Sequence, residues 1–193
     1  MNKADVIAFF DRCAPSWDAE MIRSDRIIGE ILDLGGVRPG ARVLDVACGT
    51  GVLFPDYLAR GVGSLTAIDI SPEMVRIARE KFPAVKVLCG DAETAELGGT
   101  YDAVMIYNAF PHFPDPEALF AALSRHLAPA GRLTVAHGMS RAAIDRHHSG
   151  SARAVSFGLM HEDELAALMG NFLTVDVKCS DGEKYIVSGV KKA

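Results

Sequence analysis

The fold is decided by the stretch RVLDVACGTG (Arg42–Gly51), a short apolar run that leads into a glycine turn. The β-branched and apolar residues of Arg42–Val46 predict a strand. Gly49 and Gly51 lack a Cβ atom, so the backbone can turn sharply there and a ligand can approach it closely. Taken alone, the stretch leaves a second interpretation open, namely a tight strand-to-helix turn that binds nothing.

On either side of this stretch, short apolar runs alternate with helical patterns. The other runs that predict strands are Ser64–Ile70, Val85–Cys89, Tyr101–Tyr107, Arg132–His137, Leu173–Cys179 and Lys184–Val190. Helices are predicted at Asp5–Asp11, Asp18–Leu34, Val52–Arg60, Ser71–Phe82, Asp115–Leu127 and Glu162–Met169, and residues 138–160 are less regular. This alternation indicates right-handed βαβ crossovers and a mainly parallel sheet. The Asp181-Gly182 turn between the last two strands adds an antiparallel edge.

The composition is that of one globular domain. The chain has 193 residues, of which 49% are hydrophobic and 23% charged, and its net charge is −5. An acidic chain lacks the basic surface that binds nucleic acid, and no apolar run approaches the roughly 20 residues that span a bilayer. The four cysteines form no CxxC pair. We therefore expect a cytoplasmic protein, monomeric or homodimeric, with no nucleic-acid or membrane partner and no disulfide framework.

Acidic residues stand at the ends of three successive predicted strands. Asp45 lies beside the glycine turn, Asp69 ends the second strand, and Asp91 follows the third. Because parallel strands end at one edge of a sheet, these carboxylates are expected to meet there. Asp69 can accept hydrogen bonds from ribose hydroxyls, and Asp91 can accept one from the amino group of adenine.

The same region lacks the features that bind phosphates. No lysine follows the turn as in a P-loop, and Phe54 replaces the third glycine of the dinucleotide fingerprint. A nicotinamide-dependent oxidoreductase is therefore disfavoured. A nucleoside ligand with a cationic end suits the carboxylates, and S-adenosylmethionine, with a sulfonium and an α-ammonium group, is such a ligand.

Several motifs resemble those of class I S-adenosylmethionine-dependent methyltransferases. They are LDVACGTG, AIDISPEM, GDAE and YDAVMIYNAFPHF, within Arg38–His137. The resemblance implies an α/β, three-layer, Rossmann-like fold with N-terminal helices. Its seven-stranded sheet would have the order 3-2-1-4-5-7-6, with the last strand antiparallel. Asn108-Ala109-Phe110-Pro111 departs from the Asn/Asp-Pro-Pro-Tyr motif of amino-methylating members, which disfavours that chemistry.

The resemblance also implies a set of cofactor-binding residues. They are Trp17, Asp45, Ala47, Gly49, Gly51, Asp69, Ile70, Met74, Asp91, Ala92 and Asn108. Phe9–Asp18 resembles the N-terminal helix of small-molecule members, in which an aromatic residue closes over the cofactor. Trp17 is the candidate for that role, and the alternative is that it only packs this helix onto the domain.

Histidines are concentrated where a methyl acceptor would bind. His112, His137, His147 and His148 follow the fourth and fifth predicted strands. Three interpretations stay open: an acid/base role, a divalent metal held by His137 with His147 or His148, and hydrogen-bonded loop histidines. Arg141 is a candidate for binding an anionic group of the acceptor.

The sequence thus predicts one methyltransferase domain over residues 1–193. Within it we expect a helical lid (1–36), a cofactor-binding core (37–137), an acceptor-site segment (138–160) and a C-terminal helix with two strands (161–193). The predicted reaction is in-line methyl transfer from S-adenosylmethionine to a small-molecule acceptor, with histidines or a histidine-bound metal assisting. The alternative is a non-catalytic sensor or scaffold that binds S-adenosylmethionine or S-adenosylhomocysteine.

Overall fold

A seven-stranded sheet forms the centre of the protein. The computed structural model describes residues 2–148 and 154–192. The sheet order is β3-β2-β1-β4-β5-β7-β6, as the sequence predicts. Only β7 runs antiparallel to its neighbours, pairing with β5 on one side and β6 on the other. The strands are β1 (Arg42–Val46), β2 (Ser64–Asp69), β3 (Lys86–Cys89), β4 (Tyr101–Tyr107), β5 (Leu127–His137), β6 (Leu173–Ser180) and β7 (Tyr185–Lys191).

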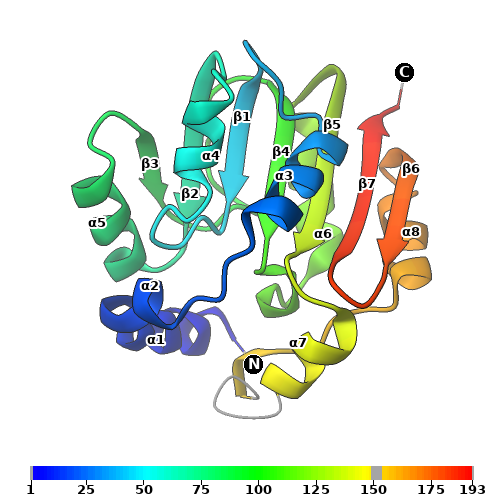
Figure 1. Ribbon diagram of the computed structural model, residues 1–193. Helices are drawn as coiled ribbons and strands as arrows, with labels where there is room; N and C mark the ends of the chain where they lie inside the picture. The colour runs from blue at the N-terminus through cyan, green and yellow to red at the C-terminus, as the bar shows by residue number, and fades with distance from the viewer. Residues whose placement is uncertain (1, 149–153, 193) are drawn as a thin grey trace.

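Helices cover both faces of the sheet and make three layers (Figure 1). One face packs against α3 (Asp25–Leu34), α4 (Phe54–Ala59) and α5 (Pro72–Lys81). The other packs against α6 (Pro116–Arg125) and α8 (Glu162–Met169). Among the described residues, no helix has the length and apolar character needed to cross a membrane.

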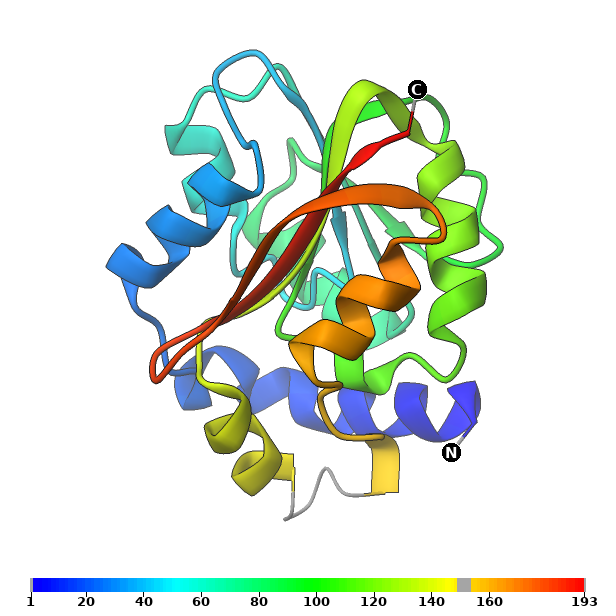
Figure 2. The same ribbon diagram turned by 90° about the vertical axis from the view of Figure 1, so that its right-hand side faces the viewer.

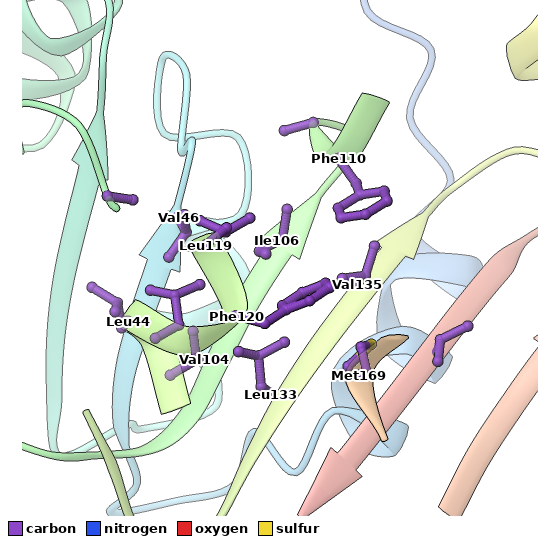
Figure 3. Packing of buried hydrophobic residues seen from close by; sticks show 14 of the residues in the cluster. Leu44, Val46, Val104, Ile106, Phe110, Leu119, Phe120, Leu133, Val135 and Met169 are labelled. Atoms are coloured by element: carbon purple, nitrogen blue, oxygen red, sulfur yellow. The ribbon is translucent and has the colours of Figure 1, made fainter. Parts of the chain in front are cut away.

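Side chains of the central strands alternate between the two cores. Val43 and Met105 contribute to the core under α3, α4 and α5. Leu44 and Ile106 contribute to the core under α6 and α8 (Figure 3). This alternation is the two-residue period of a strand. It explains why the central strands are apolar at nearly every position.

A further group of helices lies across the end of the sheet where the parallel strands finish (Figures 1 and 2). It consists of α1 (Lys3–Cys13), the short 3-10 helix η1 (Ala14–Ser16), α2 (Trp17–Glu20) and α7 (Arg141–His148). Asn2 begins α1 with a capping box, in which its side chain accepts a hydrogen bond from the backbone N–H of Asp5. These helices therefore cover the edge at which the sequence places a ligand.

The predicted helix Asp18–Leu34 is wrong as a single element. The chain is extended at Met21, and α3 starts afresh after Ser24, whose hydroxyl accepts a hydrogen bond from the backbone N–H of Ile27. The signal was present, because serine before aspartate is typical of a helix N-terminus. The break makes α2 a separate four-residue helix.

Other element boundaries also differ from the prediction. The less regular stretch 138–160 contains a helix, α7, which begins after Ser140. The helix predicted from Val52 begins at Phe54, and β5 begins at Leu127 rather than Arg132. The early part of β5 pairs with β4 through a register shift, which the apolar pattern of Arg132–His137 did not reveal.

Removing Phe120 tests the core beneath α6. Its ring is fully buried and stacks on Phe110 with centroids 5.7 Å apart. Phe120→Ala should lower the free energy of unfolding by about 3–5 kcal/mol, because a large cavity is left. Leu58→Ala is the matched control, since Leu58 is 54% exposed and should change stability little. Urea denaturation of both variants measures the difference, and equal losses would contradict this packing.

Candidate functional site

A cavity opens at the carboxyl ends of the parallel strands. Its walls come from the turn after β1, the ends of β2, β3 and β4, and the N-terminal helices. Except for Gly51, every residue predicted to bind the cofactor lines it: Trp17, Asp45, Ala47, Gly49, Asp69, Ile70, Met74, Asp91, Ala92 and Asn108. The strand-end rule therefore located the cavity.

Asp45 presents a buried carboxylate to this cavity. It is 2% exposed, and within the ranges 2–148 and 154–192 it makes no hydrogen bond. Burial, and then the neighbouring charge of Asp69, raise its pKa well above the ordinary value. An ionised carboxylate out of water is costly unless a cation or donors compensate it. This position therefore favours a positively charged ligand.

Asp69 is buried nearby but has backbone partners. One oxygen accepts a hydrogen bond from Gly49 N at 2.8 Å, and the other accepts one from Ser71 N at 2.9 Å. Burial raises the pKa of Asp69 to about 6, although these two bonds act against the shift. Each oxygen keeps lone-pair capacity for a further donor. Asp69 is thus held in place and can accept hydrogen bonds from ligand hydroxyls.

The two glycines of the turn have different roles. Gly49 has φ +55°, and a Cβ there would lie 3.7 Å from the indole nitrogen of Trp17. Gly51 has φ +84°, and a Cβ there would lie 2.7 Å from the ring of Phe54. A Cβ at Gly49 would therefore make an ordinary contact with Trp17, and it is the left-handed backbone of this position beside the cavity that favours glycine. Gly51 shapes the turn behind the wall, and its predicted contact with a ligand stays a prediction.

The sequence reasoning missed a lysine at the Asp91 edge. The ammonium group of Lys3 pairs with Asp91 Oδ2 and with Glu93 Oε2, each at 2.6 Å. All three side chains line the cavity. The first turn of α1 thereby joins the wall at this end. Nothing in the sequence signalled it, because the contact joins positions far apart in the chain.

At the opposite end, Asn108 and its neighbours follow β4. Asn108 has φ +54°, and its side-chain oxygen accepts a hydrogen bond from Gly138 N at 2.9 Å. This bond ties the end of β4 to the end of β5. Tyr107 also lines the cavity there. The missed contributors at this end are mostly apolar: Phe10, Met21, Phe113 and Pro114.

His112 is a candidate catalytic histidine that lines the cavity. Its Nδ1 lies 2.6 Å from the carbonyl oxygen of Val155, and its ring meets Phe10 edge-on with centroids 4.9 Å apart. A carbonyl can only accept, so Nδ1 carries the proton and Nε2 is the basic nitrogen of the neutral ring. Its role as an acid or base stays a prediction.

Two of the other acceptor-site candidates lie outside the cavity lining, and the side chains of two more are not among those described. His137 is 1% exposed, outside the cavity lining, with its ring 6.1 Å from that of Tyr185. Arg141 begins α7, also outside the lining. The backbones of His147 and His148 end α7, but their side chains lie outside the described part. Roles for these four residues stay predictions.

The metal interpretation gains no support from geometry. Among the residues that the structure describes, no group of three or more histidine, cysteine or acidic side chains is placed to hold a metal ion. A metal at His137 with His147 or His148 stays a prediction.

Comparisons with known proteins agree with the geometry. Residues 43–131 match the family model of a methyltransferase domain. The chain is 42% identical over 100 residues to a ubiquinone biosynthesis O-methyltransferase of Xanthomonas oryzae pv. oryzae. That alignment covers 49% of this chain and 41% of the other protein. It is 32% identical over 138 residues to a demethylmenaquinone methyltransferase of Renibacterium salmoninarum, covering 68% and 58%. The chain thus spans two fifths to three fifths of the length of these relatives.

A solved structure shares the fold across almost the whole chain. Magnesium protoporphyrin IX methyltransferase from Synechocystis PCC 6803, solved with bound S-adenosylhomocysteine, superimposes with a TM-score of 0.73. The alignment covers 98% of this chain and 99% of that one, at 18% identity. At this identity the likeness establishes the fold.

The raised pKa of Asp69 makes stability depend on pH. Folding lifts this pKa from 3.8 to about 6, so the folded protein holds a proton there that the unfolded chain has released. The associated stabilisation is present below about pH 4 and is lost as the pH rises through 6. From pH 5 to pH 7 the unfolding free energy of the wild type should fall by about 1 kcal/mol because of this group. Asp69→Asn should not show that fall. Urea titrations at both values measure this, and parallel profiles would contradict the shift.

Proposed function

We propose that the chain, which carries a class I S-adenosylmethionine-dependent methyltransferase domain, transfers a methyl group from S-adenosylmethionine to a small-molecule acceptor. The observation that carries the proposal is Asp45, a buried carboxylate that faces the cavity without a hydrogen-bond partner among the described residues. The α-ammonium group of the cofactor is a cation that compensates it. A diphosphate at this position would instead add negative charge beside two buried carboxylates.

The remaining walls suit the other parts of the same ligand. Asp69 is fixed by two backbone donors and keeps acceptor capacity for ribose hydroxyls. Met74 and Ile70 offer apolar surface beside it, and Asp91 is an acceptor for the amino group of adenine. The N-terminal helices within residues 1–36 serve as the lid, with Trp17 over the glycine turn.

Bound S-adenosylmethionine supplies an activated methyl group on a sulfonium. The acceptor oxygen forms its bond to the methyl carbon while the carbon–sulfur bond breaks and its electron pair stays on sulfur, giving S-adenosylhomocysteine. The protein has to align the acceptor, exclude water and remove the proton of the acceptor. We assign alignment of the acceptor and exclusion of water to the walls formed by Phe10 and Phe113. We assign removal of the proton to Nε2 of His112.

The acceptor we infer is a small molecule with a flat or apolar body and an ionisable oxygen. The cavity wall near His112 is apolar, formed by Phe10, Phe113 and Pro114, so a body of that kind packs there. Methyltransferases named for ubiquinone biosynthesis and for demethylmenaquinone are among the relatives. An acceptor of the quinol or phenol class is consistent with both observations.

The proposal is tested with radiolabelled S-adenosylmethionine. Incubating the protein with a panel of phenols, quinols and a metabolite extract should transfer label to a small molecule. Binding of S-adenosylhomocysteine with no transfer to any acceptor would instead support the non-catalytic sensor or scaffold. Binding of NADH without S-adenosylhomocysteine would overturn the cofactor assignment.

Asp45→Asn should weaken the binding of S-adenosylhomocysteine more than the binding of 5′-methylthioadenosine. Both ligands contain the thioadenosine part, but only the first carries an ammonium group for Asp45. Loss of a charged partner contributes about 1.5–3 kcal/mol, or a change in affinity of roughly tenfold to a hundredfold. Calorimetry with both ligands measures it. Equal loss of affinity for the two would place the ammonium group elsewhere.

His112→Gln should lower kcat while cofactor affinity stays close to that of the wild type, because glutamine keeps a donor toward Val155 but removes the basic nitrogen. Loss of a general base lowers the rate by about 10²–10⁴-fold. His126→Gln is the control, since this histidine lies outside the cavity wall. Wild-type turnover in His112→Gln would remove His112 from the mechanism.

A further inference from the structure

We propose that Asp18 is the positioning residue that holds Trp17 over the glycine turn, through its hydrogen bond with the hydroxyl of Thr50. The inference rests on the proposed cofactor site, because Trp17 covers the part of the cavity formed by that turn. Neither Asp18 nor Thr50 lines the cavity itself, so both act through Trp17.

The contact joins the lid directly to the turn. Thr50 lies between the two glycines and is fully buried, and its hydroxyl donates to Asp18 Oδ1 at 2.5 Å. The adjacent residue, Trp17, places its indole nitrogen 3.7 Å from where a Cβ of Gly49 would be. Two adjacent residues of α2, Trp17 and Asp18, therefore lie against two adjacent residues of the turn.

α2 itself adds little else that fixes it in this place, although it follows directly on η1, whose Ala14 is buried. It has four residues, none of them buried, and the chain becomes extended at Met21 directly after it. Trp17 makes an edge-on contact with Phe10, at 5.6 Å between ring centroids, but Phe10 is itself part of α1. A short helix with no buried side chain has little hydrophobic anchoring of its own. The polar contact with Thr50 is thus what sets the position of Trp17 relative to the turn.

Asp18 also pairs with Lys81 at the end of α5, with Oδ2 2.5 Å from the ammonium group. The two side chains are 46% and 35% exposed, and ion pairs in such positions contribute little because water screens them. Thr50 is fully buried, and losing its partner Asp18 would leave a buried hydroxyl unsatisfied. The hydrogen bond, rather than the ion pair, is therefore expected to dominate.

The experiment uses Trp17 as the probe, since it is the only tryptophan in the sequence. Acrylamide quenching of its fluorescence reports how far solvent reaches the indole, and calorimetry gives the affinity for S-adenosylhomocysteine. Thr50→Val keeps the shape of threonine and removes the hydroxyl, whereas Thr50→Ser keeps the hydroxyl. Asp18→Ala removes the acceptor, Asp18→Asn keeps an acceptor oxygen, and Lys81→Met removes only the ion pair.

We expect Thr50→Val and Asp18→Ala to expose Trp17 to acrylamide and to lower the affinity for S-adenosylhomocysteine about tenfold. This is the size of effect expected from the loss of one charge-assisted hydrogen bond. Thr50→Ser and Lys81→Met should stay close to the wild type in both measurements, and Asp18→Asn, which keeps a neutral acceptor, should fall between the wild type and Asp18→Ala. Asp33→Asn is a control for removing a surface acid, because Asp33 pairs with Arg60 and lies outside the cavity. A merely structural role would lower the unfolding midpoint without exposing Trp17 in the folded protein.

Three results overturn the inference in distinguishable ways. If the wild type binds S-adenosylhomocysteine and Thr50→Val matches Thr50→Ser in quenching and affinity, Asp18 does not position Trp17 while the proposed function stands. If Lys81→Met alone reproduces the effect of Asp18→Ala, the ion pair holds the lid and the assignment to Thr50 is wrong. A wild type that does not bind S-adenosylhomocysteine at all overturns the proposed function and this inference with it.

Discussion

Two carboxylates buried in one cavity set the demands that the rest of the site meets. Asp45 and Asp69 come from neighbouring parallel strands, β1 and β2. Burial raises the pKa of both carboxyl groups, and the charge of Asp69 raises the pKa of Asp45 further. Asp69 is stabilised by two backbone N–H groups, but Asp45 makes no hydrogen bond within the described ranges. A protein that keeps such a group out of water leaves a place for a cation. The proposed methyl donor supplies that cation.

The fold holds these two carboxylates in place and compensates one of them. Apolar side chains pack on both faces of the sheet and hold its strands in place. Because β1 and β2 are parallel, their acidic groups lie at one edge of the sheet. The backbone N–H groups that compensate Asp69 come from the glycine turn after β1 and from the start of α5. Both are exposed by the local backbone, the first through the left-handed conformation of Gly49. The N-terminal helices then close the cavity with Lys3, Phe10 and Trp17.

Much of the fold and the cofactor end of the site could be predicted from sequence. Apolar runs separated by helices fix a parallel sheet, and parallel strands share one edge, so Asp45, Asp69 and Asp91 had to meet. Lys3 and the break before Ser24 were missed for different reasons. The first is a contact across the chain with no local pattern, and the second was a capping signal overridden by helical periodicity.

His137 shows the limit of reasoning from strand ends. The rule places its backbone at the edge of the sheet, but successive side chains of a strand point to opposite faces. The ring is buried against Tyr185 of the antiparallel neighbour β7, outside the cavity lining. His112 follows β4 in a short 3-10 helix instead, which turns its ring toward Phe10 and the cavity.

Proton release on ligand binding tests the central claim most directly. Because burial and the charge of Asp69 raise the pKa of Asp45, an ammonium group that binds beside it should displace a proton. Calorimetry of S-adenosylhomocysteine binding in two buffers of different ionisation enthalpy measures that release. We predict net proton release that is smaller in Asp45→Asn. Net proton uptake, or release unchanged in that variant, would contradict it.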